Sequence, residues 1–243
     1  MRLYAELAPW FHLVSDPAGY EKEAAHIVAL AEAACEGRPE TLLELGAGGG
    51  CSGSHLKQRF LCTLSDISAE MLEVNRSLNP ECEHVLGDMR TLRLGHLFDV
   101  VLIHDAIGYM TSEDDLGAAI ETAAEHLRPG GAAILIPDET TESFAPGTRH
   151  GGHDGGDGRA LRFLEWSHPA EPNGTSYQTD YVVVMREAGQ PPRVELDRHR
   201  FGLFSRDTWL RLVRAAELEP LELEIKDPHA GEHVVFVARA PIS

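Results

Sequence analysis

The chain has 243 residues, of which 43% are hydrophobic and 25% charged, enough for one core and a small additional lobe. Its formal net charge of −18 repels phosphate backbones, so we expect no nucleic-acid partner. The four cysteines are scattered without metal-ligand spacing, the N-terminus lacks the apolar stretch of a signal peptide, and no segment approaches the ~20 apolar residues of a membrane span. These features predict a soluble, cytoplasmic protein without membrane contact or bound metal.

Helix-like and strand-like segments alternate over the first 137 residues. An alanine-rich helix is predicted over residues 21–35, and short strands follow at 41–45, 61–67, 83–86, 98–103 and 132–136. Ser68 and Ser112 are suited to cap helices between these strands. This alternation with short links predicts a doubly wound, mostly parallel sheet with helices on both faces.

The pattern changes after residue 137. Residues 145–160 are glycine-rich and polar and predict a mobile loop. Three strand-like segments without intervening helices follow at 162–167, 176–186 and 194–201, which predict a small antiparallel β insert. A helix capped by Ser205 and two strands at 221–225 and 233–237 then complete a seven-stranded sheet. The short turn between these strands predicts that the last one is antiparallel.

Four regions follow from this pattern. Residues 1–36 form an N-terminal helical lid region, and residues 37–140 form a cofactor-binding α/β core. Residues 141–203 hold the loop and the antiparallel insert, on the acceptor side or at an oligomer contact. Residues 204–243 form a C-terminal helix and β-hairpin that complete the core, and a homodimer is compatible with this organisation.

The first predicted strand runs into an acidic, glycine-rich turn at residues 44–50 (ELGAGGG). Glycines permit a tight strand-to-helix turn and a close approach of the backbone to a ligand. The Glu44 carboxylate suits a cationic amino group and is a poor neighbour for a pyrophosphate. Residues 48–53 nevertheless fit GxGxxG, the dinucleotide fingerprint, so the turn alone leaves the ligand open.

Two further carboxylates follow the second and third predicted strands. Asp66 can accept hydrogen bonds from both ribose hydroxyls of an adenosine, in NAD or in S-adenosylmethionine. Asp88 can accept from the adenine amino group, and Met89 can pack on the ring. An ordinary turn position is the alternative for both aspartates.

Five segments in register, ELGAGGG, SDIS, GDMR, FDVVLIHDAIGYM and LRPGGAAILI, resemble class I S-adenosylmethionine-dependent methyltransferases over about residues 40–137. The N-terminal segment, the inserted strands and HRFGLFSRDTWLRLVRAAEL are similar to small-molecule methyltransferases, above all the N,N-dimethyltransferases of nucleotide-linked amino sugars. The resemblance implies S-adenosyl-L-methionine as cofactor and a sheet with a reversed seventh strand. Two features depart from the pattern: Gly49 stands where threonine or serine is common, and the histidine-rich loop 149–157 has no counterpart in the sugar enzymes.

The resemblance also implies roles for individual residues. Tyr20 would contact the methionyl end of the cofactor, and His104 would lie beside the transferring methyl group. The full set of implied cofactor contacts is Tyr20, Glu44, Gly46, Ala47, Gly48, Asp66, Ile67, Met71, Asp88, Met89 and His104.

Polar side chains follow the fourth and fifth predicted strands, at the edge where open α/β sheets bind ligands. His104, with an unperturbed pKa of about 6.5, is the candidate base or acceptor-orienting group, although it could only pack against the cofactor. Asp105 could attract an amine electrostatically. The catalytic candidates are His104, His12 and Asp105, and the substrate candidates are Trp10, Tyr109, Asp138, Trp166, Tyr177 and His199.

Together these features predict an enzyme that moves a methyl group by in-line displacement to a small-molecule acceptor, an amine of an amino sugar or another metabolite. The alternatives are O-methylation of a small hydroxylated metabolite, an NAD-dependent oxidoreductase, and a non-catalytic cofactor-binding protein. Residues 10–12 are expected to form a lid or to pack as a plain helix. The segment 149–154 is expected to be a substrate-gating lid or an inert linker rather than a metal site, because flexible glycine pairs surround its histidines.

Overall fold

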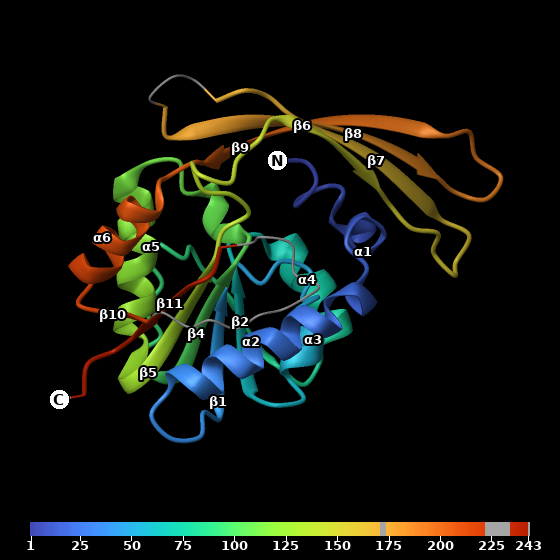
Figure 1. Ribbon diagram of the computed structural model, residues 1–243. Helices are drawn as coiled ribbons and strands as arrows, with labels where there is room; N and C mark the ends of the chain where they lie inside the picture. Colours follow the sequence, from blue (N-terminus) through green and yellow to red (C-terminus); the bar gives the residue numbers. More distant parts are fainter. Residues whose placement is uncertain (171–173, 222–233, 243) are drawn as a thin grey trace.

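A computed structural model describes residues 1–170, 174–221 and 234–242 of the chain. Two β-sheets form its framework, a seven-stranded core sheet and a four-stranded sheet that lies across one end of it (Figure 1). The strand order of the core sheet is β10-β11-β5-β4-β1-β2-β3. The bounds are β1 Thr41–Leu45, β2 Leu61–Asp66, β3 Glu83–Leu86, β4 Phe98–His104, β5 Leu127–Ile136, β10 Glu219–Leu221 and β11 Phe236–Arg239.

The central strands of the core sheet run parallel. β1 pairs with β2 and β4, β2 also pairs with β3, and β4 also pairs with β5, all in parallel register. β11 is antiparallel to both β5 and β10. All seven residues of β4 are buried, because helices cover that near-continuous apolar strand on both faces. The predicted α/β fold with a reversed last strand is confirmed; residues 222–233, which include parts of the predicted strands 221–225 and 233–237, lie outside the described residues.

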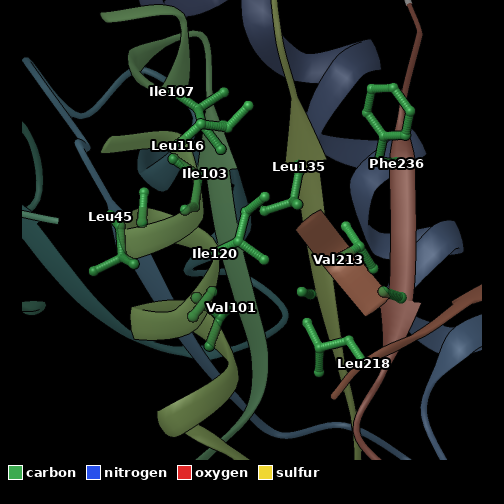
Figure 2. Close-up of a cluster of buried hydrophobic side chains, with 14 of the residues drawn as sticks. Leu45, Val101, Ile103, Ile107, Leu116, Ile120, Leu135, Val213, Leu218 and Phe236 are labelled. Atoms are coloured by element: carbon green, nitrogen blue, oxygen red, sulfur yellow. The ribbon is translucent and has the colours of Figure 1, made fainter. Parts of the chain in front are cut away.

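Helices cover the two faces of the core sheet. On one face, α5 and α6 pack over a cluster in which Ile103, Ile120 and Phe236 are buried (Figure 2). On the other face, α2 and α3 cover a second buried cluster. No helix in the described ranges is long and apolar enough to cross a membrane. The helices are α1 Phe11–Val14, α2 Glu21–Ala34, α3 Gly53–Leu56, α4 Ala69–Leu78, α5 Glu113–Glu125 and α6 Arg206–Ala215, and the 3-10 turns are η1 Ala8–Trp10, η2 Pro17–Tyr20 and η3 Ala106–Tyr109.

Serine side chains begin three of the helices, as the sequence predicts. Ser68, Ser112 and Ser205 each accept a hydrogen bond from the backbone N–H three residues on, at 3.1, 3.1 and 3.2 Å. Each bond satisfies a donor that the first turn of a helix leaves unpaired. Two of these caps fix where α4 and α5 begin beside the ends of the core strands.

The four-stranded sheet is antiparallel, in the order β6-β7-β8-β9. Its strands are β6 Gly147–Gly151, β7 Ala160–Ser167, β8 Ser176–Arg186 and β9 Arg193–Gly202. β6 falls in residues 145–160, where the sequence predicted a mobile loop, and for residues 147–151 that prediction is wrong. The backbone of β6 pairs with β7 through Gly147 opposite Ser167 and Gly151 opposite Phe163. Backbone pairing needs no apolar side chains, so glycine and polar residues concealed this edge strand.

The N-terminal segment lies beneath the four-stranded sheet (Figure 1). Trp10 is buried there in a cluster with Leu161 and Val183 of that sheet. Arg2 forms an ion pair with Glu195 of β9, and the backbone N–H of Leu3 donates to the Asp197 carboxylate at 2.8 Å. The segment therefore closes one side of the space between the two sheets.

Candidate active site

A cavity of about 640 Å³ lies between the carboxyl ends of the core strands and the inner face of the four-stranded sheet. Ligands of open α/β sheets bind at this edge. The structure brings to this one cavity every residue implied as a cofactor contact: Tyr20, Glu44, Gly46, Ala47, Gly48, Asp66, Ile67, Met71, Asp88, Met89 and His104. We call the part of the cavity that these residues line the cofactor end.

The glycine-rich turn after β1 forms one wall of the cofactor end. Gly46 has a φ of +78°, and a Cβ there would lie 2.4 Å from the Cβ of Ala106, so only glycine fits. The carbonyl oxygen of Gly48 accepts a hydrogen bond at 3.1 Å from the side chain of Asn75, which is fully buried. Sequence analysis missed this asparagine, because nothing in its spacing announces a partner in the turn.

The other glycines of the turn are required by packing. A Cβ at Gly50 would lie 2.3 Å from a buried asparagine side chain of α4, and a Cβ at Gly49 would lie 2.5 Å from the ring of Phe11. A threonine or serine at position 49 would therefore meet Phe11. Packing therefore explains the glycines at positions 49 and 50. The match of residues 48–53 to GxGxxG does not require a bound pyrophosphate.

Glu44 is a buried carboxyl group with an unsatisfied atom. Its side chain is 3% exposed, and its Oε2 atom has no hydrogen-bond partner within the described residues. Burial raises the pKa of Glu44 to about 7, against the lowering effect of the His104 charge. A cationic amino group in the cavity would supply the missing partner, and the methionyl ammonium of S-adenosylmethionine fits that requirement.

Asp66 stands at the end of β2 and already holds the turn. Its Oδ2 atom accepts from the Gly48 N–H and its Oδ1 atom from the Ser68 N–H, both at 2.8 Å. Each oxygen keeps a lone pair for a ribose hydroxyl. Ile67, the next residue, lines the cavity although its side chain is 67% exposed. It therefore offers an apolar surface on which a planar ring could pack.

Asp88 is more occupied than the sequence suggested. The Arg90 guanidinium donates to both of its carboxylate oxygens, at 3.0 and 2.6 Å, and also pairs with Asp115 at 2.8 Å. These hydrogen bonds lower the pKa of Asp88. The carboxylate therefore stays ionised, and Arg90 fixes its orientation. Its remaining lone pairs can still accept a hydrogen bond from an adenine amino group beside Met89.

His104, at the end of β4, is held between carboxylates. Its Nε2 atom lies 3.1 Å from Glu23 Oε1 and 3.2 Å from Asp105 Oδ1. Burial alone would lower the pKa of His104, but Asp105, Glu23 and Glu44 together raise it to about 10. The Nε2 atom therefore donates to carboxylates, and the Nδ1 atom lies 3.3 Å from the Ser52 hydroxyl, so the geometry does not favour His104 as a base for an acceptor.

Asp105 adopts a backbone conformation that few side chains tolerate. Its φ is +50°, and its backbone is fixed by a hydrogen bond from its N–H to Ile136 at 2.9 Å and by one from Gly108 to its carbonyl at 2.8 Å. Such strain is retained where the surrounding structure enforces it, often at functional sites. It places the Asp105 carboxylate in the lining of the cavity, beside His104.

The far part of the cavity, which we call the acceptor end, is aromatic and acidic. It is lined by Tyr4, Tyr109, Asp138, Phe163, Glu165, Tyr181 and Phe201. Of these, only Tyr109 and Asp138 were candidates from the sequence. The Tyr109 hydroxyl lies 2.8 Å from the Tyr4 hydroxyl and 2.8 Å from His199 Nδ1, and His199 Nε2 lies 2.9 Å from Asp197. His199 is 1% exposed, so it positions Tyr109 and does not itself line the cavity.

Four further candidates do not line this cavity. Trp166 is 53% exposed on the outer face of the four-stranded sheet, so it is not a substrate residue of this cavity. Trp10 packs under the same sheet, and His12 contacts the Gly49 carbonyl oxygen through Nε2 at 2.9 Å, which corrects both expectations to structural roles. Tyr177 lines a smaller adjoining cavity.

The histidine-rich segment forms β6 and the turn after it. His153 Nδ1 lies 4.0 Å from Asp16, and Asp154 pairs with Arg162 at 2.9 Å. Within the described ranges, no group of three or more histidine, cysteine or acidic side chains could hold a metal ion. These contacts tie the segment to the N-terminal region and to β7.

Comparisons with known proteins add to this geometry. A methyltransferase domain model matches residues 42–131. The chain is 30% identical over 217 residues to dTDP-3-amino-3,6-dideoxy-alpha-D-glucopyranose N,N-dimethyltransferase of Streptomyces fradiae, covering 88% of this chain and 84% of the relative. It is 32% identical over 186 residues to a Streptomyces venezuelae N,N-dimethyltransferase of a related trideoxy sugar, covering 76% and 77%. The solved structure of Streptomyces venezuelae DesVI superposes with a TM-score of 0.83 and 27% identity, covering 96% of this chain and 98% of that one.

A shared fold alone would leave the activity open, since one fold can carry many reactions. Here the sequence identity extends over most of both chains, and every residue that the resemblance implies as a cofactor contact lines the cavity. An NAD-dependent oxidoreductase and a non-catalytic binding protein are thereby set aside. The chain belongs to the S-adenosylmethionine-dependent methyltransferases, in the family that contains these sugar N,N-dimethyltransferases.

Proposed function

We propose that this enzyme methylates an amino group of an amino sugar or a closely similar small molecule. The observation that carries the proposal is the state of His104, the group placed where a base for a hydroxyl acceptor would stand. Its Nε2 atom faces the Glu23 and Asp105 carboxylates and therefore donates, and its Nδ1 atom faces the Ser52 hydroxyl at 3.3 Å, so neither ring nitrogen is placed to take a proton from an acceptor. A neutral amine already has the lone pair that attacks a methyl group, whereas a hydroxyl needs a base to become an effective nucleophile.

Bound S-adenosylmethionine supplies a methyl group on a sulfonium, and the amine lone pair forms the new N–C bond as the S–C bond breaks. The side chains of this protein contribute position. Glu44, Asp66 and Asp88 would hold the amino, ribose and adenine groups of the cofactor, and the rings of Tyr109 and Phe201 form a wall at the acceptor end. Alignment of two reactants can supply roughly 7–11 kcal/mol of a barrier, so geometry accounts for much of the catalysis.

The product of each transfer is an ammonium, which must lose a proton before a second methyl group can be added. Asp138 lines the acceptor end, and burial raises its pKa well above the ordinary value. A carboxylate oxygen of Asp138 is therefore suited to accept an N–H hydrogen bond and to take up that proton.

The test is direct. The purified protein, S-adenosylmethionine and a panel of amino sugars, each paired with the hydroxyl sugar of the same configuration, are analysed by mass spectrometry for added methyl groups. We expect one or two methyl groups on nitrogen and none on the hydroxyl analogues. Methylation of the hydroxyl analogues alone would overturn the proposal and favour O-methylation.

We also propose that the enzyme is a homodimer that uses the outer face of the four-stranded sheet. An antiparallel sheet normally turns a polar face to solvent, but here that face exposes Leu164, Trp166, Val184, Val194 and Leu196. Light scattering should find a dimer for the wild type and a monomer for Trp166→Arg. A monomeric wild type would contradict the proposal.

The cytoplasm is the compartment that fits the cysteines. All four are free thiols, and three of them are buried, as in proteins of reducing compartments. We propose that the enzyme works there, and fractionation of cells that produce it would locate it.

A further inference from the structure

A chain of hydrogen-bonded side chains leads from the four-stranded sheet to the acceptor end of the cavity. His199 Nε2 lies 2.9 Å from Asp197 Oδ2, and His199 Nδ1 lies 2.8 Å from the Tyr109 hydroxyl. The side chains of His199 and Asp197 are 0% and 8% exposed, so both are withdrawn from solvent. Of these three residues, only Tyr109 lines the cavity. The buried pair can therefore act on a bound molecule only through Tyr109.

Tyr109 stands between the cofactor end and the acceptor end. It is the last residue of η3, which begins at Ala106. Ala106 abuts the glycine-rich turn, since a Cβ at Gly46 would lie 2.4 Å from its Cβ. The ring of Tyr109 packs on Phe201 of the acceptor end, with ring centroids 4.8 Å apart. An acceptor that reaches toward a cofactor held at the turn therefore meets Tyr109.

The neighbours of His199 decide which ring nitrogen carries the proton. Burial alone would raise the pKa of Asp197, but hydrogen bonds from the Leu3 and Arg198 backbone N–H groups, at 2.8 and 3.0 Å, help to lower it. Burial lowers the pKa of His199, and Asp197 offsets this only in part, so the ring is neutral at pH 7. A neutral imidazole has one N–H and one lone pair. The ionised Asp197 accepts from the Nε2–H, which leaves the lone pair on Nδ1.

The lone pair on His199 Nδ1 fixes the direction of the Tyr109 hydroxyl. This hydroxyl has one proton, and both His199 Nδ1 and the Tyr4 oxygen lie 2.8 Å away. Nδ1 can only accept, so the proton between these two atoms comes from Tyr109. The Tyr4 hydroxyl, in contrast, carries a proton of its own. The Tyr109 proton therefore points at His199, and its oxygen keeps a lone pair for the cavity.

We propose that Asp197 and His199 are positioning residues that prevent Tyr109 from donating a hydrogen bond to the acceptor nitrogen. The inference rests on the proposed N-methylation. A neutral amine has a single lone pair, which must form the new N–C bond, and a hydroxyl that donates to this lone pair would block it. Because His199 holds its proton, Tyr109 accepts from an N–H of the amine. The amine lone pair is then free to face the methyl group.

Asp197→Asn reverses this arrangement. The amide NH2 group can donate to His199 Nε2, which moves the ring proton to Nδ1 and releases the Tyr109 proton toward the amine. With the amino sugar that the panel above identifies, we expect kcat to fall about 10- to 100-fold and KM for S-adenosylmethionine to stay unchanged. His168→Gln is the matched control, because His168 pairs with Asp180 of the same sheet at 2.8 Å and lines neither of the two cavities. Its kcat should equal that of the wild type, and an equally unchanged kcat in Asp197→Asn would overturn the proposal.

Tyr109→Phe separates a misdirected hydroxyl from a general loss of structure. The substituted ring can still pack on Phe201 but has no proton to donate. The double variant Asp197→Asn/Tyr109→Phe should therefore be no slower than Tyr109→Phe alone. A purely structural role of Asp197 predicts instead that the two losses multiply. Multiplied losses would overturn the proposal.

Nitrogen NMR tests the state of His199 without turnover. The protein is labelled with 15N-histidine, and the signals of His199 are identified among those of 13 histidines by their loss in His199→Asn. We expect a protonated Nε2 and an unprotonated Nδ1 in the wild type at neutral pH, and the reverse in Asp197→Asn. A protonated Nδ1 in the wild type would overturn the proposal even if amines are methylated. The expected tautomer together with methylation of the hydroxyl analogues alone would instead overturn the proposed function.

Discussion

Replacing Glu44 with glutamine is expected to stabilise the free protein and to weaken cofactor binding at the same time. The carboxylate is 3% exposed and one of its oxygens has no partner among the described residues, so its ionised form is costly without ligand. Burial raises the pKa of Glu44 from 4.5 to about 7, which corresponds to about 3 kcal/mol against the ionised form at about 1.36 kcal/mol per pKa unit.

The pH dependence follows from the direction of that change. Because the pKa of Glu44 is higher in the folded protein, its contribution to stability is fully present below about pH 4.5 and is lost as the pH rises through about 7. At pH 8, Glu44→Gln should melt at a temperature up to about 6–12 °C above the wild type, at ~2–4 °C per kcal/mol. The difference should disappear near pH 4.

Cofactor binding should change in the opposite direction. S-adenosylhomocysteine has the same methionyl ammonium, and loss of a charge-assisted hydrogen bond of about 1.5–3 kcal/mol weakens binding by about 10- to 150-fold. Scanning and titration calorimetry measure both effects on one preparation. A lower melting temperature of the free variant at pH 8, or equal affinity of both proteins for S-adenosylhomocysteine, would refute this account of Glu44.

Three further substitutions probe the same site. His104→Gln should reduce the stability of the protein most below pH 6.5 and least above about pH 10, because the raised pKa of His104 keeps the ring charged up to that pH. Thermal melts across this range measure the loss, and a loss that does not change with pH would contradict the prediction. Gly46→Ala should lower the free energy of unfolding by about 1–3 kcal/mol and abolish cofactor binding, because the new Cβ would lie 2.4 Å from the Cβ of Ala106. A folded variant that binds the cofactor normally in calorimetry would contradict this prediction. His12→Ala should lower the free energy of unfolding in denaturant by about 1 kcal/mol, because the His12 ring contacts the Gly49 carbonyl and does not line the cavity. The pH–rate profile should be unchanged. Loss of one titrating limb of that profile in the variant would instead support a catalytic role for His12.

The cofactor end could be predicted from sequence because its residues sit on strand ends. Parallel strands carry their carboxyl termini to one edge, so Glu44, Asp66 and Asp88 converge whatever the details of the loops. The partner of His104, in contrast, comes from a distant part of the chain. Glu23 reaches His104 from α2, and no local pattern announces that contact, although it changes the charge of the imidazole.

The insert was predicted as a sheet, but the face of each residue was not. Alternation along a strand gives two sets of side chains and does not say which set turns inward. Tyr181 and His199 lie on the inner face, whereas Trp166 lies on the outer face. Only the packing of Trp10 and its neighbours beneath the sheet determines which face turns inward. Aromatic residues on both faces made composition uninformative.

The acidic lining is best understood from where positive charge stands during the reaction. Transfer from a sulfonium to an amine carries the charge from the cofactor end to the acceptor end. Glu44 lines the cofactor end and Asp138 the acceptor end, and His104, which lines the same cavity, pairs with Glu23 and Asp105. A field that is negative at both ends stabilises reactants and products alike, so it supports binding more than it lowers the barrier. Removal of carboxylates at the acceptor end should therefore raise KM, whereas altered packing of Tyr109 should lower kcat.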